Sequence, residues 1–330
     1  ISVSACSHTE SVFIKQRFLT LKWKLLYRKF KTACKLFKRE KRELENIEVT
    51  LVSSFTVNGK GGNPAGVVFN ADKLSDAQKL KVAQIVGYSE TAFVSNDDEV
   101  DFEVSFFTTT GEVDFCGHAT LATFSTMYHK GILTEGSYVQ RTKAGILPVT
   151  IESNGKVVME QQLPEKIDFF SYQEVSKVIG IESSILESTN LPIEVISTGL
   201  PDVIIPVPYG YLDLIEPDDE LISDFCKKHK AVGFHVFELC EPESILTASC
   251  RNFAPLFGIS EESATGSSSG ALACYLTEHL ALGRDYVFEQ GRAMNCTSII
   301  TASVKSYDST IINVKVSGYA SSIGTMVVPL

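Results

Sequence analysis

Asp114-Phe-Cys-Gly-His-Ala-Thr-Leu-Ala-Thr-Phe124 and Ser263-Ala-Thr-Gly-Ser-Ser-Ser-Gly-Ala-Leu-Ala-Cys-Tyr275 begin alike in this 330-residue sequence. In each segment, small and hydroxyl-bearing residues precede an apolar run, which predicts a tight turn that opens a helix. Such a turn leaves backbone N–H groups free at the positive end of the helix dipole, where a carboxylate can bind. Either segment alone is typical of an ordinary helix cap, whereas the pair indicates a shared role.

The elements around these two helices also occur twice in the same order. The first set has strands over 47–55 and 67–69, a helix over 75–87, strands over 91–95 and 100–108, the first helix opening, and strands over 138–159. The second set has strands over 193–207, a helix over 218–229, strands over 232–253, the second helix opening, and strands over 286–316. The offset of about 145 residues predicts two half-chains of one architecture, over 47–165 and 166–330, with a last strand able to return to the first half.

Facing halves would place both helix openings in one cleft, and clefts between domains are where small-molecule sites are commonest. A purely structural role in tight turns is also open for Gly117, Gly266 and Gly270 of these openings, and is an equal alternative for Gly62 and Gly66 earlier in the chain.

Composition limits the classes of protein to consider. Hydrophobic residues make up 44% of the chain and charged residues 21%, which excludes a disordered or collagen-like chain. No run approaches eighteen uncharged apolar residues, so we expect no membrane span. Residues 1–46 carry twelve Lys and Arg against four Glu, whereas the remainder carries eighteen basic and thirty-six acidic residues. A body this acidic repels a phosphate backbone, so nucleic acid is not an expected partner.

The basic stretch 1–46 is expected to lie outside the fold. Its Lys and Arg residues alternate with apolar residues at roughly helical spacing. Three interpretations stay open: an amphipathic targeting or membrane-surface helix, a partner-binding arm, or an appendage without a role. Eight cysteines show no C-x-x-C pair and no regular spacing, which indicates reduced thiols of a cytoplasmic protein. They are Cys6, Cys34, Cys116, Cys226, Cys240, Cys250, Cys274 and Cys296.

Departures from the duplication are candidates for catalysis, because a substrate held between similar halves needs an asymmetric chemical group. Glu90 stands directly before an apolar strand, and the corresponding region of the second half, 233–237, has no acid. A partly buried carboxylate at this place can take up a proton and return it, although a surface glutamate at a strand edge is the ordinary alternative. His118 in the first turn of its helix can orient a substrate or donate a hydrogen bond, or be merely structural.

Other familiar sites are missing from the sequence. Histidines and carboxylates do not occur at metal-ligand spacing, so no metal is expected. The chain also lacks the G-x-S-x-G elbow, the G-x-x-x-x-G-K-[ST] loop and a dinucleotide G-x-G-x-x-G motif. Hydrolase, NTPase and dehydrogenase functions therefore lack their usual sequence marks, and we expect no cofactor.

Five motifs together resemble the PhzF family, named for an isomerase of phenazine biosynthesis, whose members share the diaminopimelate-epimerase fold. The motifs are Gly62-Asn-Pro-Ala-Gly-Val-Val68, Ser89-Glu-Thr-Ala-Phe-Val94, Glu112 with Phe115-Cys-Gly-His-Ala-Thr-Leu-Ala122, Arg251 with Phe253-Ala-Pro255, and Glu261 with Ala264-Thr-Gly-Ser267. They occur in the family's order over about residues 47 to 330. Each motif alone is weak, and their combination is specific.

The resemblance implies an α+β fold of two pseudo-symmetric domains, each a β-barrel-like roll around a central helix, and commonly a homodimer. It implies a cofactor-independent and metal-free isomerase that moves a proton between carbons of a small anionic metabolite. Glu90 would be the acid/base, and His118 and Ser267 would bind and orient the substrate. The motif positions implied to line the substrate are Asn63, Ser89, Gly117, Ala119, Thr265 and Gly266.

One departure from the family's pattern lies in the second helix opening. Where the family usually has E-D-P-A-T-G-S, this chain has Glu261-Glu-Ser-Ala-Thr-Gly-Ser267, so Glu262 replaces an active-site aspartate. An added methylene moves a carboxylate by about 1 Å, enough to misplace a catalytic group. We therefore expect Glu262 to be an auxiliary catalytic residue, and we do not assign the phenazine precursor as the substrate.

Two alternatives accompany the isomerase hypothesis. A non-catalytic protein of the same fold would bind a metabolite or a protein without turnover. A cysteine-based racemase would use a facing pair of thiols, one of which is Cys116, but the mirror position in the second half holds Ala264 and Thr265. A small buried hydrophobic role is the ordinary alternative for this cysteine.

Overall fold

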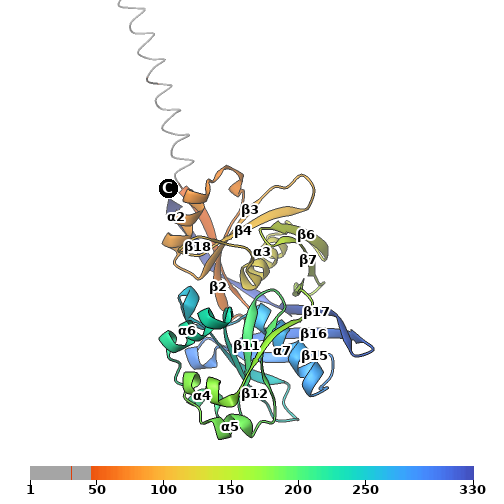
Figure 1. The fold of residues 1–330 in the computed structure, drawn as a ribbon. Helices are drawn as coiled ribbons and strands as arrows, with labels where there is room; N and C mark the ends of the chain where they lie inside the picture. Colours follow the sequence, from red (N-terminus) through yellow and green to blue (C-terminus); the bar gives the residue numbers. More distant parts are fainter. Residues whose placement is uncertain (1–30, 32–45) are drawn as a thin grey trace, which may run out of the picture. The chain divides into compact units, whose positions relative to one another are not determined.

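The computed structural model describes residue 31 and residues 46–330 (Figure 1). One compact unit, Glu48–Met326, contains both predicted halves except residue 47 and residues 327–330, which are assigned to the other unit with residues 1–46. The interpretations of the basic stretch, and two of the eight cysteines, fall on residues outside the described part. The six described cysteines are free thiols, four of them buried.

The first half begins and ends with strands and contains two α-helices. Its elements are β1 (Asn46–Ser54), β2 (Asn63–Val68), α2 (Asp76–Val86), β3 (Glu90–Ser95), β4 (Phe102–Phe107), β5 (Glu112–Val113), α3 (Gly117–His129), β6 (Gly136–Thr142), β7 (Gly145–Ile151) and β8 (Val157–Glu160).

The second half repeats this order and adds two helices near its start. Its elements are β9 (Glu165–Phe170), α4 (Tyr172–Ile179), α5 (Ser183–Glu187), β10 (Ile193–Ser197), β11 (Pro201–Pro206), α6 (Asp219–His229), β12 (Gly233–Leu239), β13 (Ala248–Ala254), β14 (Ile259–Glu262), α7 (Gly266–His279), β15 (Asp285–Gln290), β16 (Ser298–Tyr307), β17 (Thr310–Gly318) and β18 (Ala320–Pro329).

The strand pairing of the two halves is the same. β2 runs parallel to β3, and β3 pairs antiparallel with β4. In the second half, β11 runs parallel to β12, and β12 pairs antiparallel with β13. The predicted α+β fold of two similar halves is therefore confirmed.

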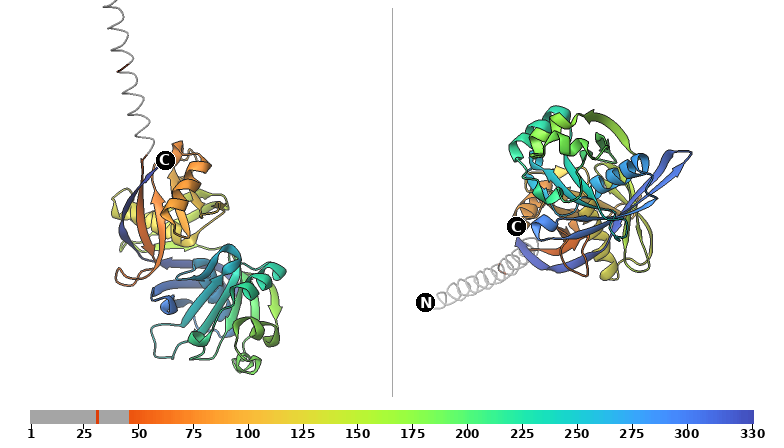
Figure 2. Two further views of the ribbon diagram at one scale, coloured as in Figure 1. Left: turned by 90° about the vertical axis from the view of Figure 1, so that its left-hand side faces the viewer. Right: turned by 90° about the horizontal axis from the view of Figure 1, so that it is seen from below.

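Each half wraps its strands around one central helix (Figures 1 and 2). α3 packs against β2, β3, β7 and β8, while α7 packs against β10, β11, β16 and β17. Both helices are buried almost all round, from His118 to Met127 in α3 and from Ser268 to Leu276 in α7. Such all-round burial explains why their sequences are small and apolar without an exposed charged face.

The larger hydrophobic cluster of the molecule belongs to both halves. It includes Leu121 and Phe124 of α3 together with Leu272 and Tyr275 of α7. A second cluster lies entirely in the second half, where α4 and α6 cover strands β10 to β13. β17 pairs with β16 on one side and with β8 on the other, so the last strand but one joins the sheet of the first half.

The strand expected over 67–69 begins earlier, at Asn63. Gly62 makes the preceding turn with φ +86°, and a Cβ there would lie 2.5 Å from the carbonyl oxygen of Ser54. Pro64 is accommodated because the parallel pairing with β3 starts only at Ala65, so its missing N–H faces no partner in β3. The Asn-Pro-Ala-Gly sequence is thus part of the strand instead of a turn. α4 and α5 are two further helices that were not predicted from the sequence.

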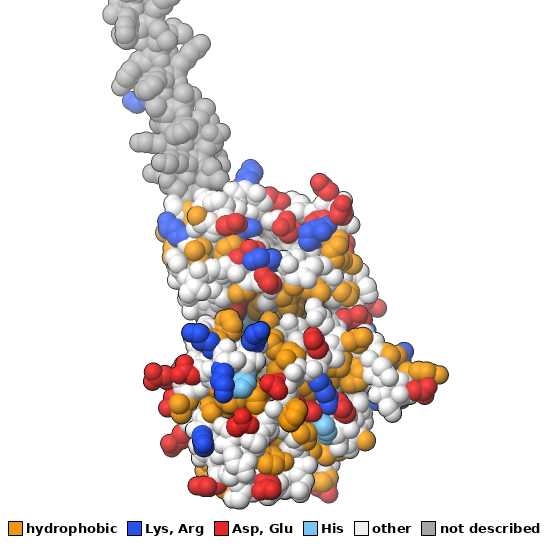
Figure 3. Space-filling model, in the orientation of Figure 1, with side chains coloured by type: hydrophobic (Ala, Val, Ile, Leu, Met, Phe, Trp, Pro, Cys, Tyr) orange, Lys and Arg blue, Asp and Glu red, His pale blue; other side chains and the backbone are white. Residues whose placement is uncertain are grey.

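The surface of the described part is mixed in charge. On the face drawn in Figure 3, acidic and basic side chains are interspersed with apolar ones. In residue 31 and residues 46–330, no helix is both long and apolar enough to cross a bilayer.

Candidate active site

His118 lies at the centre of the site, in the first turn of α3. This helix begins at Gly117 after the N-cap residue Cys116, and the His118 side chain is only 4% exposed. Ser54, at the end of β1, donates a hydrogen bond of 2.6 Å to the backbone carbonyl of His118. The helix opening is thereby fixed to a neighbouring strand, which holds the imidazole in place.

Glu90 approaches the imidazole from one side. It is the first residue of β3 and is 8% exposed, and its Oε2 lies 3.2 Å from His118 Nε2. Ser89 Oγ lies 3.4 Å from the same nitrogen. Despite this proximity, Glu90 Oε2 is buried without a well-formed hydrogen bond to any described residue. The carboxylate therefore has an acceptor oxygen available to a further group.

Glu262, the last residue of β14, approaches the imidazole from the other half. Its Oε1 lies 3.6 Å from His118 Nδ1 and accepts a hydrogen bond of 2.9 Å from Asn63 Nδ2. Its Oε2 accepts a bond of 2.6 Å from Thr265 Oγ1. Burial is the main cause that raises the pKa of Glu262 to about 7; the nearby Glu90 acts in the same direction, while His118 and the hydrogen bonds from Thr265 and Asn63 oppose the shift.

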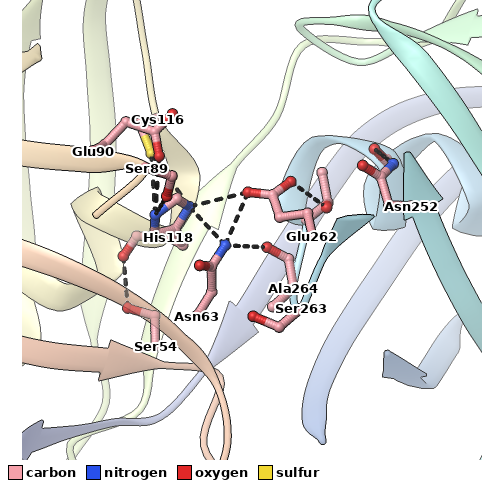
Figure 4. Close-up of polar contacts among 12 residues, drawn as sticks. Ser54, Asn63, Ser89, Glu90, Cys116, His118, Asn252, Glu262, Ser263 and Ala264 are labelled. Atoms are coloured by element: carbon pink, nitrogen blue, oxygen red, sulfur yellow. Dashed lines mark hydrogen bonds and ion pairs between the residues drawn. The ribbon is translucent and has the colours of Figure 1, made fainter. Parts of the chain in front are cut away.

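The imidazole thus lies between two carboxylates from opposite halves of the chain (Figure 4). Asn63 also donates to the carbonyl of Ala264 at 2.9 Å, which gives the two halves a second direct link. Groups that exchange protons readily near neutral pH are the ordinary equipment of acid/base catalysis. The arrangement can accept, hold and return a proton.

The duplication makes this chemistry asymmetric. The first residue pair between β2 and β3 is Ala65 with Glu90, and the first pair between the equivalent strands β11 and β12 is Asp202 with Gly233. The counterpart of Glu90 in the second half is therefore Gly233. Ser267 is the counterpart of His118, because each is the second residue of its central helix.

Cys116 lies close to the imidazole, with Sγ 3.4 Å from His118 Nδ1. Burial, followed by the negative charge of Glu90, raises the pKa of this thiol well above its usual value. Its counterpart, the N-cap of α7, is Thr265. A facing thiol pair is therefore not formed at these two positions, and the proton stays on Cys116.

The same three side chains could offer ligands to a metal ion. Glu90, Cys116 and His118 place one ligand atom each within 4.8 Å of one another. A metal would have to displace the proton of a thiol whose surroundings favour the neutral form. The metal-free site stays a prediction from the sequence.

The remaining predicted positions lie in the same two helix openings. Thr265 binds Glu262, as described, whereas Ser267 is held through its carbonyl oxygen, which accepts a bond of 3.0 Å from Thr198 Oγ1. Gly117 and Gly266 are the first residues of α3 and α7. Ala119 is fully buried in the core, so its side chain faces protein atoms in this structure.

Two residues that support the site carried no signal in the sequence. Ser54 secures the opening of α3, and Gln290 in β15 donates to the carbonyl of Glu262 at 2.7 Å and to Thr265 Oγ1 at 3.0 Å. Both come from strands whose local sequence is ordinary. Their role depends on tertiary contacts that a single sequence does not display.

Comparison with known proteins places this chain in a family. The family model for phenazine biosynthesis-like proteins (PhzC-PhzF) matches residues 52–325. An uncharacterized isomerase of Clostridium acetobutylicum is 35% identical over 283 residues, covering 82% of this chain and 93% of the relative. A trans-2,3-dihydro-3-hydroxyanthranilate isomerase of Pseudomonas chlororaphis is 28% identical over 283 residues, covering 83% of this chain and 96% of the relative.

Solved structures agree with this relationship. A phenazine biosynthesis protein of the PhzF family from Bacillus anthracis superimposes with a TM-score of 0.80 at 28% identity, covering 87% of this chain and all of that one. A hydroxyproline epimerase from Agrobacterium vitis, at 11% identity and a TM-score of 0.59, shares the fold. The chain therefore belongs to the phenazine biosynthesis-like PhzF family, and it is an enzyme of the isomerase class.

Proposed function

We propose that this isomerase moves a proton between two carbons of a small amino- or hydroxy-bearing carboxylate, without cofactor or metal, and that Glu90 is the acid/base. One observation carries the proposal. A nearly buried carboxylate oxygen of Glu90 lies without a well-formed hydrogen bond beside the imidazole of His118. A buried acceptor oxygen without a well-formed hydrogen bond carries a desolvation cost, so such a group is expected where a substrate completes it.

In the proposed step, Glu90 Oε2 forms an O–H bond with a proton taken from one substrate carbon. The electron pair of the broken C–H bond is delocalised into the substrate, and the proton is then returned to a second carbon of the same molecule. His118 and Ser267 donate hydrogen bonds that orient the substrate. Glu262 is the auxiliary group: it faces His118 from the other half and can share a proton with the imidazole.

The openings of α3 and α7 are proposed to bind the substrate carboxylate. Backbone N–H groups in the first turn of a helix have no partner within the helix and lie at its positive end. Asn63, Ser89, Gly117, Ala119, Thr265 and Gly266 are the proposed binding positions around these turns. A locally positive binding place makes an anionic substrate compatible with an acidic protein surface.

Substrate entry requires the two halves to separate at the site. The side chains of Glu90, His118 and Glu262 are at most 13% exposed, and hydrogen bonds from Asn63 to Glu262 and Ala264 join the halves over them. We propose that these bonds open for binding and re-form around the substrate, which would exclude water during proton transfer.

Solvent-deuterium exchange tests the proposal. Trans-2,3-dihydro-3-hydroxyanthranilate, the compound named for the Pseudomonas relative, is the first probe, followed by other small amino- and hydroxycarboxylates. Wild-type protein in deuterated water should introduce deuterium at a carbon of at least one probe. The Glu90→Gln variant should reduce the rate by roughly 10² to 10⁴-fold while calorimetric binding of the same probe persists.

Glu112→Gln is the matched control, because Glu112 lies in β5 just before the same helix and is partly exposed beside Lys143. It should leave the exchange rate within about twofold of wild type. Exchange that survives in Glu90→Gln would remove this residue from the mechanism. Binding without exchange in the wild type would favour a non-catalytic role of the same cleft.

The protein is further proposed to act in the cytoplasm as a homodimer. The six described cysteines are unpaired, as in proteins of reducing compartments. Analytical ultracentrifugation at micromolar concentration would check the assembly, and a purely monomeric protein would contradict it.

A further inference from the structure

The second half encloses a buried polar cluster that the proposed proton transfer does not use. Its members are Asp202 in β11, His235 in β12, Asn252 in β13 and Ser268 in α7. They are 3%, 0%, 2% and 0% exposed, respectively. Four polar side chains from four different elements therefore meet inside one half of the molecule.

The hydroxyl of Ser268 joins the cluster together. Its Oγ donates a hydrogen bond of 2.6 Å to Asp202 Oδ2 and accepts one of 3.2 Å from Asn252 Nδ2. Asn252 Nδ2 also lies 3.3 Å from His235 Nδ1. His235 Nε2 is buried without a partner among the described residues. The first turn of α7 is thereby tied to two strands at once.

The first half serves as an internal comparison, because its strand register identifies the equivalent positions. Ala65 pairs with Glu90 in the first half as Asp202 pairs with Gly233 in the second, so Ala65 is the equivalent of Asp202. By the same register, Ala92 is the equivalent of His235. Ala92 pairs with Phe106 as His235 pairs with Asn252. The third residue of the central helix is Ala119 in α3 and Ser268 in α7, so Ala119 is the equivalent of Ser268.

All four equivalents in the first half are apolar, and all four are fully buried. They are Ala65, Ala92, Phe106 and Ala119. The same architecture is therefore built without any polar group at these positions. The polar cluster is not a requirement of the fold.

Burial of these groups carries a cost. Desolvation raises the pKa of Asp202 to about 7 and lowers that of His235 to about 3, so burial favours the neutral form of both groups. An incompletely bonded polar cluster stabilises a protein less than well-packed apolar side chains do. Its presence in only one half calls for a role that the other half does not have.

The position of the cluster indicates that role. Asn252 is the cross-strand partner of Glu262 between β13 and β14, and it lies on the side of Glu262 away from His118 (Figure 4). Ser268 follows Thr265 by three residues in the same helix opening, and Thr265 Oγ1 binds Glu262 Oε2. The cluster thus holds both the strand and the helix turn from which Glu262 is positioned.

We infer that Asp202, His235, Asn252 and Ser268 are positioning residues that fix Glu262 and the opening of α7 against His118. This inference rests on the proposed function for its catalytic consequence. The first half has no equivalent need, because the counterpart of Glu262 there is Val113, which pairs with Phe106 as Glu262 pairs with Asn252.

The test replaces the cluster with the residues of the first half: Asp202→Ala, His235→Ala, Asn252→Phe and Ser268→Ala. The phenylalanine takes up space that the smaller side chains release, so we expect a folded protein with a melting temperature within about 5 °C of wild type. Backbone amide hydrogen exchange over 262–268 should accelerate by roughly tenfold or more. Deuterium incorporation into the probe carboxylate should slow by about tenfold or more, through kcat.

Single variants keep the test decisive if the fourfold variant does not fold. Ser268→Ala should accelerate amide exchange at the same turn. Asp202→Asn keeps an acceptor oxygen for Ser268, so it should retain at least about half of the wild-type rate of deuterium incorporation into the probe. Thr277→Ala is the control on the same helix, because Thr277 Oγ1 bonds Ala273 and Tyr286 near the other end of α7. It should leave exchange over 262–268 unchanged.

Unchanged amide exchange over 262–268 in both the fourfold and the Ser268→Ala variants would overturn the inference. So would a general loss of stability with uniformly faster exchange, because that is the signature of a merely structural cluster. If wild-type protein exchanges deuterium into no probe, the proposed function fails, while the amide-exchange measurements still decide whether the cluster positions the helix opening.

Discussion

Glu262 is a carboxyl group whose surroundings favour its neutral form. Its oxygens accept hydrogen bonds from Asn63 and Thr265, but the loss of water around them outweighs these bonds. The added methylene relative to the family's usual aspartate does not withdraw the carboxylate, since Oε1 lies 3.6 Å from His118 Nδ1. The substitution therefore keeps a titrating group at this position.

Stability should depend on pH through Glu262. Its pKa is about 7 in the folded protein against 4.5 ordinarily, so between these values the folded state binds the proton more tightly than the unfolded state does. Stability then falls as pH rises from about 4.5 to about 7, by about 3 kcal/mol. Glu262→Gln should remove this contribution, which urea unfolding at several pH values would measure. An identical pH dependence in the two proteins would contradict the burial of this charge.

Cys116→Ser should leave the deuterium-exchange rate within a few-fold of wild type. The thiol is kept protonated by burial and by Glu90, and its counterpart in the other half is a threonine, so it has no partner for two-base chemistry. Rates of deuterium incorporation for both proteins, with melting temperatures as a control for folding, would check this. Complete inactivity of a well-folded serine variant would support a thiol mechanism.

The sequence singled out Glu90 and His118 as candidates for a physical reason, and the structure places their side chains 3.2 Å apart. Glu90 and His118 interrupt an internal duplication, and such interruptions are visible without a structure. Ser54 and Gln290 are not, because their polar atoms act on backbone and side-chain groups far away in the chain. The polar cluster around Ser268 was equally invisible, since each member alone is an ordinary residue of a strand or helix.

At the scale of elements, a close approach behind the site links β17 to the core. A Cβ on Gly318, the last residue of β17, would lie 2.5 Å from Phe55 Cδ1. Phe55 is fully buried and has φ 64°, a backbone conformation that is uncommon for a bulky residue. Its ring also lies next to Gly266, the first residue of α7.

Gly318→Ala should therefore destabilise the protein by about 1–3 kcal/mol, because the ring of Phe55 has little room to move. Gly111→Ala is the control, since a Cβ there meets no atom within 4 Å, and its effect should stay within about 0.5 kcal/mol. Chemical denaturation of the two variants beside wild type would measure the difference. Equal stability of both would show that the core adapts around Phe55.

Most of the elements were predicted because small and hydroxyl-bearing residues mark the start of both central helices and because the same order of elements occurs twice along the chain. The start of β2 at Asn63 and Pro64 was missed because these residues are typical of turns. They fit here because the beginning of the strand pairs with β1 alone, and pairing with β3 starts at Ala65. α4 and α5 were missed because they are short, at eight and five residues. Their stability depends on packing against the second cluster more than on intrinsic preference.

At the scale of the whole chain, the two halves share one core. Leu121 in α3 and Leu272 in α7 belong to the same hydrophobic cluster and are fully buried. Leu121→Ala and Leu272→Ala should each cost about 2–5 kcal/mol and should shift a single unfolding transition. Hydrogen exchange should then accelerate in α3 and α7 together for either variant. Acceleration confined to the mutated half would show that the halves unfold independently.

The distance along the chain between the partners of the site has a consequence for biosynthesis. Asn63 and Glu262 are separated by 199 positions, and the sheet of the first half is completed by β17. A ribosome adding roughly 5–20 residues per second would need about 10 to 40 seconds to deliver the second partner after the first. A polypeptide terminated before residue 262 would accordingly carry Glu90 and His118 yet lack the carboxyl group that faces the imidazole from the other half.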